Sequence, residues 1–400
     1  MENSAATLTN GRYDGPRAIA EIKRIGGRVE SAVHTVTLGG TRASDAEVAS
    51  LQGFPHLREL SLFGTLVSDD GLAALAALTR LERLNLGGTK LSAAGIAHLA
   101  GLGELIELNL AGVKVGDDAV AHLAELKRLR ELNLGGTLAG DVGLASIARL
   151  SNLEWLDLRY TQITDHALSN LSNFPRLAVL FLYGTKVTDA GMSHLACLRQ
   201  PRRLYLNFTK VGDDGLAPLA QLTSLEVLSL SGTLVTDAGL SHLANLSALE
   251  SLILCPAITD AGLVHLRPLT RLKSLFLSAA AVTDDGLAEL ATFPELEALH
   301  LSGTAISDAG LRHIAALPKL RALDLSGTRV TGVSLDSLKT MRSLRSLDLT
   351  HTEVNSLGLA HLAEMTQLED LRINSPKVTE NAFRSLRQSI PLTRIHRRYT

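Results

Sequence analysis

Residues 225–248 read LEVLSLSGTLVTDAGLSHLANLSA, and variants of this stretch fill most of the 400-residue chain. Its first position recurs every 24 residues in both directions, except for one step of 23 residues. The recurring positions are Val33, Leu57, Leu81, Leu105, Leu129, Leu153, Leu177, Pro201, Leu225, Leu249, Leu272, Leu296, Leu320, Leu344, Leu368 and Leu392. About fifteen copies in phase predict a solenoid, in which one small structural unit is stacked repeatedly.

Each repeat carries the signals of a strand, a turn and a short helix. The segment L-x-x-L-x-L alternates apolar and variable residues, which is typical of a half-buried strand. A glycine then allows the turn, and a threonine such as Thr65 can satisfy backbone groups inside the bend. Ser/Thr-Asp pairs such as Thr188-Asp189 precede leucines at helical spacing, so both residues are expected to cap the helix.

With these motifs the chain resembles the leucine-rich-repeat superfamily, specifically the bacterial 24-residue type whose copies read VTDAGLAHLA. The resemblance covers about Val33 to Ile395. It implies an α/β solenoid: a right-handed horseshoe with a parallel β-sheet on the concave face, short helices on the convex face, and binding through the concave face. Where the best-known repeat of the family has asparagine, this chain has mostly threonine, so a hydroxyl ladder is expected to replace the buried asparagine ladder.

Three segments are expected along the chain. Residues 1–32 form a polar N-terminus and a helical cap, residues 33–391 the repeat array, and residues 392–400 a partial repeat and C-terminal cap. The cap helix is indicated by Ala18, Ile19, Ile22 and Ile25 at helical spacing between Asp14-Gly15-Pro16 and Gly26-Gly27. Five arginines between Arg384 and Arg398 fit a solvated cap or a patch for an acidic partner.

The composition limits the classes of partner. Basic and acidic residues nearly balance, at 39 and 41, so no strong field favours nucleic acid or an anionic membrane. No apolar run approaches a membrane span, and the N-terminus has no secretion-signal core. The only cysteines, Cys197 and Cys255, lie in different repeats, which suggests a reducing compartment. We therefore expect a cytoplasmic monomer, or alternatively a protein secreted without a cleavable signal peptide.

Departures from the repeat average mark candidate binding residues on the concave face. Aromatic and arginine side chains replace small or polar residues in coils five to seven, and these residue types are enriched in binding hot spots. The alternative is that neighbouring aromatic rings simply stack across strands. The residues predicted to bind a partner are Trp155, Asp157, Arg159, Tyr160, Phe181, Tyr183, Arg203, Tyr205, Phe208, Phe276 and His300.

The face before these coils has a different pattern. We call the residues at one position of successive repeats a column. The charges of Glu59, Arg83 and Glu107 alternate in sign along one column, and those of Arg58 and Glu82 alternate along the neighbouring column. The row Asn85, Asn109 and Asn133 could form a stack of amides. Because such neighbours can satisfy one another, a structural role is expected here.

No catalytic or metal site and no cofactor is predicted. Seven histidines share one helical position, but this position alternates with Ser, Ala, Pro and Glu, and zinc needs three or four convergent ligands. The aspartate column lacks the several oxygens of a calcium loop. His300, Asp324 and Ser302 come near one another, but an open sheet offers no oxyanion hole, so polar binding contacts are expected instead.

The function expected from these patterns is a non-enzymatic protein-interaction scaffold that binds a partner on its concave face, centred on coils five to seven. Two alternatives stay open at this point. The chain could be a host-directed effector that recruits ubiquitin-ligase or signalling machinery, or it could be a receptor for a peptide or carbohydrate. The 23-residue coil at Leu249 loses its Gly-Thr pair near Cys255, and a local irregularity in curvature is expected there.

Overall fold

The computed structural model describes residues 15–29 and 34–396. Val33, where the array was expected to begin, and residues 397–400 lie outside the described residues. The chain divides into two compact units, unit 1 (residues 1–177) and unit 2 (residues 178–400). This division was not indicated by the sequence, and the segment boundaries expected from the sequence stay predictions.

In unit 1, strands β2 to β7 run parallel and each pairs in register with the next. Strand β1 pairs antiparallel with β2. The strands are β1 Arg28–Val29, β2 Thr35–Thr37, β3 Glu59–Ser61, β4 Arg83–Asn85, β5 Glu107–Asn109, β6 Glu131–Asn133 and β7 Trp155–Asp157. The helices are α1 Gly15–Arg24, α2 Asp45–Ser50, α3 Asp69–Leu75, α4 Ala93–Ala97, α5 Asp117–Ala121, α6 Asp141–Ser146 and α7 Asp165–Leu168, with 3-10 helices η2 Leu51–Gly53, η3 His98–Gly101 and η4 Ser169–Asn173.

Unit 2 repeats the same arrangement with ten parallel strands. The strands are β8 Val179–Phe181, β9 Arg203–Tyr205, β10 Val227–Ser229, β11 Ser251–Ile253, β12 Ser274–Phe276, β13 Ala298–His300, β14 Ala322–Asp324, β15 Ser346–Thr350, β16 Asp370–Asn374 and β17 Arg394–His396. The helices are α8 Asp189–Met192, α9 Asp237–Leu240, α10 Asp260–Val264, α11 Leu311–Ile314, α12 Ser356–His361 and α13 Glu380–Ser389, with 3-10 helices η5 Ser193–Cys197, η6 Asp214–Gln221, η7 Ser241–Leu243, η8 Gly286–Thr292, η9 Leu335–Thr340 and η10 Leu362–Glu364.

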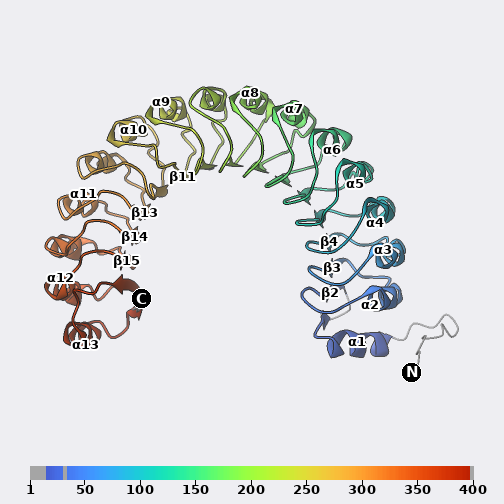
Figure 1. Cartoon of the computed structure of the whole chain (residues 1–400), viewed down its shortest axis with the longest axis horizontal. Helices are drawn as coiled ribbons and strands as arrows, with labels where there is room; N and C mark the ends of the chain where they lie inside the picture. The colour runs from blue at the N-terminus through green and yellow to red at the C-terminus, as the bar shows by residue number, and fades with distance from the viewer. Residues whose placement is uncertain (1–14, 30–33, 397–400) are drawn as a thin grey trace. The chain divides into compact units, whose positions relative to one another are not determined.

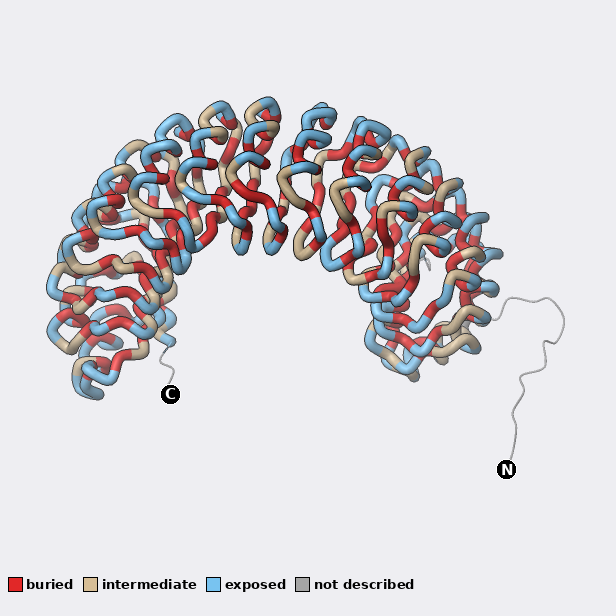
Figure 2. The backbone as a smooth tube through the Cα atoms, turned by 45° about the horizontal axis from the view of Figure 1, so that its top comes forward, coloured by how far each residue is buried: buried red, intermediate tan, exposed pale blue. Residues whose placement is uncertain are grey.

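Within each unit the strands line the inner side of the curve and the helices lie on the outer side (Figure 1). Each coil carries buried stretches toward its interior and exposed stretches on its outer turns (Figure 2). In the coil that begins at Leu225, seven aliphatic side chains are fully buried: Leu225, Leu228, Leu230, Val235, Leu240, Leu243 and Leu246. Within each unit the repeated leucines thus form a shared aliphatic core, as the stacking of coils predicts.

The helix expected at the N-terminus is present as α1, and its Ile22 is fully buried. Across the described residues, no helix is both long and apolar enough to cross a membrane.

The threonine after the turn acts within its own coil. The Thr65 hydroxyl donates to the Leu62 carbonyl at 2.7 Å, and the Thr233 hydroxyl donates to the Leu230 carbonyl at 2.7 Å. Both threonines are buried. The predicted role inside the bend is therefore confirmed, but these hydroxyls do not link one coil to the next as a ladder.

The links between coils come from the aspartate column instead, which corrects the expectation that the aspartates cap their own helices. Asp213 accepts the backbone N–H of Thr236 at 2.7 Å and its hydroxyl at 2.6 Å, and Thr236 is the cap of the next helix. The carboxylates that accept from the next coil in this way are Asp45, Asp69, Asp117, Asp141, Asp189, Asp213, Asp237, Asp260, Asp284 and Asp308. We call this set the aspartate ladder.

The 23-residue coil keeps the strand register of its neighbours, so the strand pairing shows no irregularity there. Its turn does differ from the others. Cys255 is buried and its thiol donates to the Val235 carbonyl at 2.8 Å, in the preceding coil. The deletion is therefore absorbed in the turn, and the expected effect on curvature stays a prediction.

Candidate functional site

The residues predicted to bind a partner fall into two sets, one on each unit. Unit 1 carries Trp155, Asp157, Arg159 and Tyr160. Unit 2 carries Phe181, Tyr183, Arg203, Tyr205, Phe208, Phe276 and His300. The geometry below concerns each set within its own unit.

Asp157 was expected to face a partner, but its side chain is fully buried. Its carboxylate accepts the backbone N–H of Arg159 at 2.9 Å and the Arg159 Nε at 2.7 Å. In the preceding coil, the side-chain oxygen of Asn133 closes the equivalent turn by accepting the backbone N–H of Gly135. Asp157 therefore shapes the turn and holds the half-exposed Arg159, which is the group that a partner could reach.

Four aromatic side chains of unit 2 form two cross-strand pairs, and we call them the aromatic cluster. The rings of Phe181 and Tyr205 stack with their centroids 4.3 Å apart and their planes 1° from parallel. The rings of Tyr183 and Phe208 meet edge to face at 5.1 Å and 65°. Such pairs contribute about 0.5–1.5 kcal/mol each, so part of their role is structural. Arg203, beside them on β9, is exposed and has no ion-pair partner within residues 15–29 and 34–396.

Phe208 and Tyr160 occupy a strained backbone position. At this repeat position φ is positive, Ala279 and His351 also occupy it, and most coils carry glycine there: Gly40, Gly64, Gly88, Gly112, Gly136, Gly184, Gly232, Gly303 and Gly327. Phe208 has φ of 53° and Tyr160 has φ of 55°, in the left-handed region that costs a residue with a Cβ about 1–2 kcal/mol. Their side chains are also 57% and 58% exposed. Strain combined with exposure of an aromatic ring is costly for a residue that only supports the fold.

Phe276 and His300 form a third stacked pair, with ring centroids 4.2 Å apart. His300 Nδ1 lies 3.8 Å from an Asp324 carboxylate oxygen. Burial raises the pKa of Asp324, but the nearby His300 imidazole and the hydrogen bonds from Ser326 outweigh burial and hold this pKa below its ordinary value. The Ser302 hydroxyl accepts from the Ser326 hydroxyl at 2.8 Å. Ser302 is therefore bonded to Ser326 and not to His300. Ser302, His300 and Asp324 do not form a hydrogen-bonded relay.

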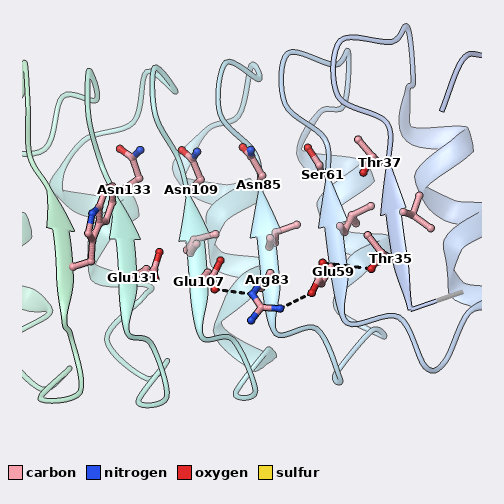
Figure 3. A pocket seen from close by; sticks show the side chains of 15 residues that line it. Thr35, Thr37, Glu59, Ser61, Arg83, Asn85, Glu107, Asn109, Glu131 and Asn133 are labelled. Carbon is pink, nitrogen blue, oxygen red and sulfur yellow. Dashed lines mark hydrogen bonds and ion pairs between the residues drawn. The ribbon is translucent and has the colours of Figure 1, made fainter. Parts of the chain in front are cut away.

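A groove lies on the inner face of unit 1 (Figure 3). Its volume is about 290 Å³ and it crosses strands β2 to β7. We call it the unit-1 groove, and its lining residues are Thr35, Val36, Thr37, Glu59, Leu60, Ser61, Arg83, Leu84, Asn85, Glu107, Leu108, Asn109, Glu131, Asn133 and Trp155. Of the predicted binding residues, Trp155 is the one that lines it.

Arg83 occupies the middle of the groove between two carboxylates (Figure 3). Its Nε donates to Glu107 at 2.6 Å and its Nη1 donates to Glu59. Arg58 and Glu82 form a second pair beside them. The alternation of charge predicted for these columns is therefore confirmed.

The three asparagines do lie in one row along the groove, but their oxygens are engaged within their own coils (Figure 3). Asn85 Oδ1 accepts the N–H of Gly87 at 3.0 Å, and Asn109 Oδ1 accepts that of Ala111 at 2.8 Å. Asn133 Oδ1 accepts the N–H of Gly135 in the same way, at 2.9 Å. The three side chains are therefore oriented by hydrogen bonds to the backbone of their own coils, and not by the stack of amides expected from the sequence.

Glu131 was not singled out by the sequence analysis, although it stands at the next position after Glu59, Arg83 and Glu107. Strict alternation of charge would place a basic residue at this position. The chain instead has a second glutamate there, followed by Trp155 on the next strand. Partial burial raises the pKa of Glu131, and the nearby Glu107 and Glu154 raise it further, while Arg83 lowers it. The break in alternation is the signal by which the sequence could have identified it.

The histidine column does not gather ligands. Within the part of the chain that the structure describes, no group of three or more His, Cys, Asp or Glu side chains is placed to hold a metal ion. Both cysteines are free thiols, Cys197 exposed and Cys255 buried.

Comparison with known proteins agrees with this architecture. A family model described as "Leucine-rich repeat region" matches residues 108–331, which is more than half of the chain. Two further leucine-rich-repeat models match residues 318–375 and residues 55–76. No curated protein matches the chain by sequence.

Several solved structures share the fold. A leucine-rich-repeat protein of Leptospira interrogans is 19% identical with a TM-score of 0.64, and the match covers 97% of this chain and 100% of that one. An internalin of Listeria monocytogenes is 22% identical with a TM-score of 0.55, covering 84% of this chain and 86% of that one. The leucine-rich-repeat ectodomain of a membrane receptor kinase from Arabidopsis thaliana, in complex with Casparian strip integrity factor 2, is 17% identical with a TM-score of 0.57, covering 93% of this chain and 51% of that one. The repeat, the coil geometry and the family models agree, and the chain belongs to the leucine-rich-repeat family.

Proposed function

We propose that the chain is a non-enzymatic protein-interaction scaffold, and that the aromatic cluster with Arg203 is the centre of its contact with a partner. The observation that carries this proposal is Phe208, which keeps an exposed aromatic ring at a backbone position where most coils have glycine. Strained residues persist at binding sites because their role there offsets the cost. Trp155, Arg159 and Tyr160 are proposed as a separate set of contacts on unit 1.

The family supports the class of function. Leucine-rich-repeat proteins generally act as binding scaffolds, and the Arabidopsis ectodomain was solved in complex with Casparian strip integrity factor 2. A monomeric state, a cytoplasmic location, the absence of nucleic-acid and membrane partners, and the effector and receptor alternatives stay predictions.

The double variant Tyr205→Ala/Phe208→Gly tests the proposed contact. Removing two hot-spot aromatics should weaken partner binding by about 30-fold or more. The fold should persist, because glycine is the usual residue at the position of Phe208. The purified chain is used to capture partners from a lysate of the native organism, and each captured protein is then titrated calorimetrically against the variants.

The matched control is Phe63→Ala, which removes an aromatic ring of unit 1 that is 52% exposed. It should bind each captured protein as the unaltered chain does. Unchanged affinity of the double variant for all of them would contradict the assignment.

A further inference from the structure

Glu131 on β6 lines the unit-1 groove and forms no ion pair with any residue that the structure describes. Glu59 and Glu107, by contrast, share Arg83. We infer that the unit-1 groove binds an extended segment of a partner polypeptide, with an arginine side chain of that segment on Glu131. This site goes beyond the proposed function, because Glu131 and the asparagine row are not among the contacts proposed above, although Trp155 belongs to both sets.

The basic residues near Glu131 are already occupied. A second hollow of about 430 Å³ adjoins the groove and includes Arg128 and Arg130 in its lining. Arg128 pairs with Glu104, and Arg130 pairs with Glu154 at 3.3 Å. The groove therefore offers a carboxylate to a cation that arrives from outside.

The surroundings of Glu131 suit a guanidinium group. A carboxylate and a guanidinium match as two parallel hydrogen bonds, which an ammonium group cannot reproduce. Trp155 is the register partner of Glu131 on the neighbouring strand and lines the same groove. Neighbouring strands lie about 4.8 Å apart, within the range over which an indole ring attracts a cation.

The asparagine row supplies contacts for the backbone of the segment. The oxygens of Asn85, Asn109 and Asn133 are used in their own turns, while their amide nitrogens have no hydrogen-bond partner within the described residues. These nitrogens can donate to carbonyl groups of a chain that crosses the strands. Three strands span about 10 Å, which three extended residues cover.

The small residues that follow the asparagines keep this row accessible. Gly87, Ala111 and Gly135 stand two positions after the asparagines, so no large side chain covers the row from these positions. The groove is thus polar along one side and acidic at Glu131, which fits an extended segment that ends in an arginine.

The test uses the full chain and the acetylated, amidated pentapeptide GSASR. Trp155 is the only tryptophan of the chain, so its fluorescence reports events in the groove directly. The control peptide carries citrulline in place of arginine, which keeps the shape and removes the charge. We expect the arginine peptide to bind about tenfold or more tightly than the citrulline peptide, because charged hydrogen bonds are the stronger class.

Glu131→Gln should abolish this preference, measured by calorimetry as well as by fluorescence. Its melting temperature should equal or exceed that of the unaltered chain, because an ionised Glu131 is disfavoured by burial and by Glu107. The matched control is Glu297→Gln in unit 2, whose glutamate lies 3.6 Å from Arg321, and it should keep the preference.

Equal binding of the two peptides, absence of binding by both, or a preference that survives Glu131→Gln would overturn the inference. Tyr205→Ala/Phe208→Gly should bind the arginine peptide normally, so a failure of this site and a failure of the aromatic cluster are separate results.

Discussion

Leu359→Ala should lower the free energy of unfolding by about 2–5 kcal/mol, whereas Leu357→Ala should leave it nearly unchanged. Both leucines lie in helix α12, Leu359 with no exposed surface and Leu357 with 75% of its surface exposed. Truncating Leu359 removes apolar contacts and leaves a cavity in the shared core of neighbouring coils. Truncating Leu357 removes a side chain that is already in water.

The comparison isolates burial because the two substitutions are chemically identical and share one helix, so helix propensity cancels. Urea unfolding followed by far-ultraviolet circular dichroism measures both. Amide hydrogen exchange should also rise in β15 and β16, the strands of the coils around the cavity. Similar losses for the two variants would contradict the core assignment.

Asp308→Ala should lower the free energy of unfolding by about 2 kcal/mol at neutral pH. The Asp308 carboxylate accepts the N–H and hydroxyl of Thr331 at 2.9 and 2.6 Å, and the N–H groups of Gly332 and Ser334 at 3.2 Å. Removing it leaves four donors of the next coil without this acceptor. The matched control is Asp336→Ala, one coil later, because Asp336 is exposed and should contribute little.

The effect of Asp308 should also depend on pH. Burial raises the pKa of Asp308, but its hydrogen bonds outweigh burial and leave the pKa below its ordinary value. A carboxyl whose pKa is lowered by folding stabilises the fold above its unfolded-state pKa, and this contribution is lost as the pH falls through its folded-state pKa. Thermal melts of the unaltered chain and Asp308→Ala should therefore converge in acid, and a constant difference at all pH values would argue against the ladder.

The fold was predictable from the sequence because every coil repeats the same local rules. The leucine pattern of residues 225–248 specifies a strand, a turn and a helix, and each coil must stack to bury these leucines. The register follows because the period is constant, and the 23-residue coil shows that a lost residue is taken up in the turn.

The aspartate ladder was not predictable in the same way. Asp213 directly precedes a helix in the sequence, which favours a capping role, while its actual partner Thr236 lies 23 residues further on. Only the stacking of coils brings the two together. The division into two units likewise has no signal in the repeat.

The candidate site was predictable only in part. Exposed aromatics such as Phe208 replace glycine, and this departure is visible in the sequence. Asp157 shares a column with Asn133 and was expected to face outward, but its short carboxylate turns back to its own coil. Identifying Glu131 as a candidate required knowing which charged side chains already form ion pairs, and this depends on side-chain geometry.

The aspartate ladder is missing between two neighbouring coils of unit 1. Ala93 stands where the aspartate would be, opposite Gly116, and no described carboxylate bridges the helical edges there. Strands β4 and β5, which belong to these coils, carry the middle of the unit-1 groove. Among the described residues, the helical edge of unit 1 thus lacks an inter-coil carboxylate behind the groove, whereas the ion pair of Arg83 with Glu107 joins the same two coils on the strand side. These two coils are therefore held together by strand pairing and by this ion pair, and not by the aspartate ladder.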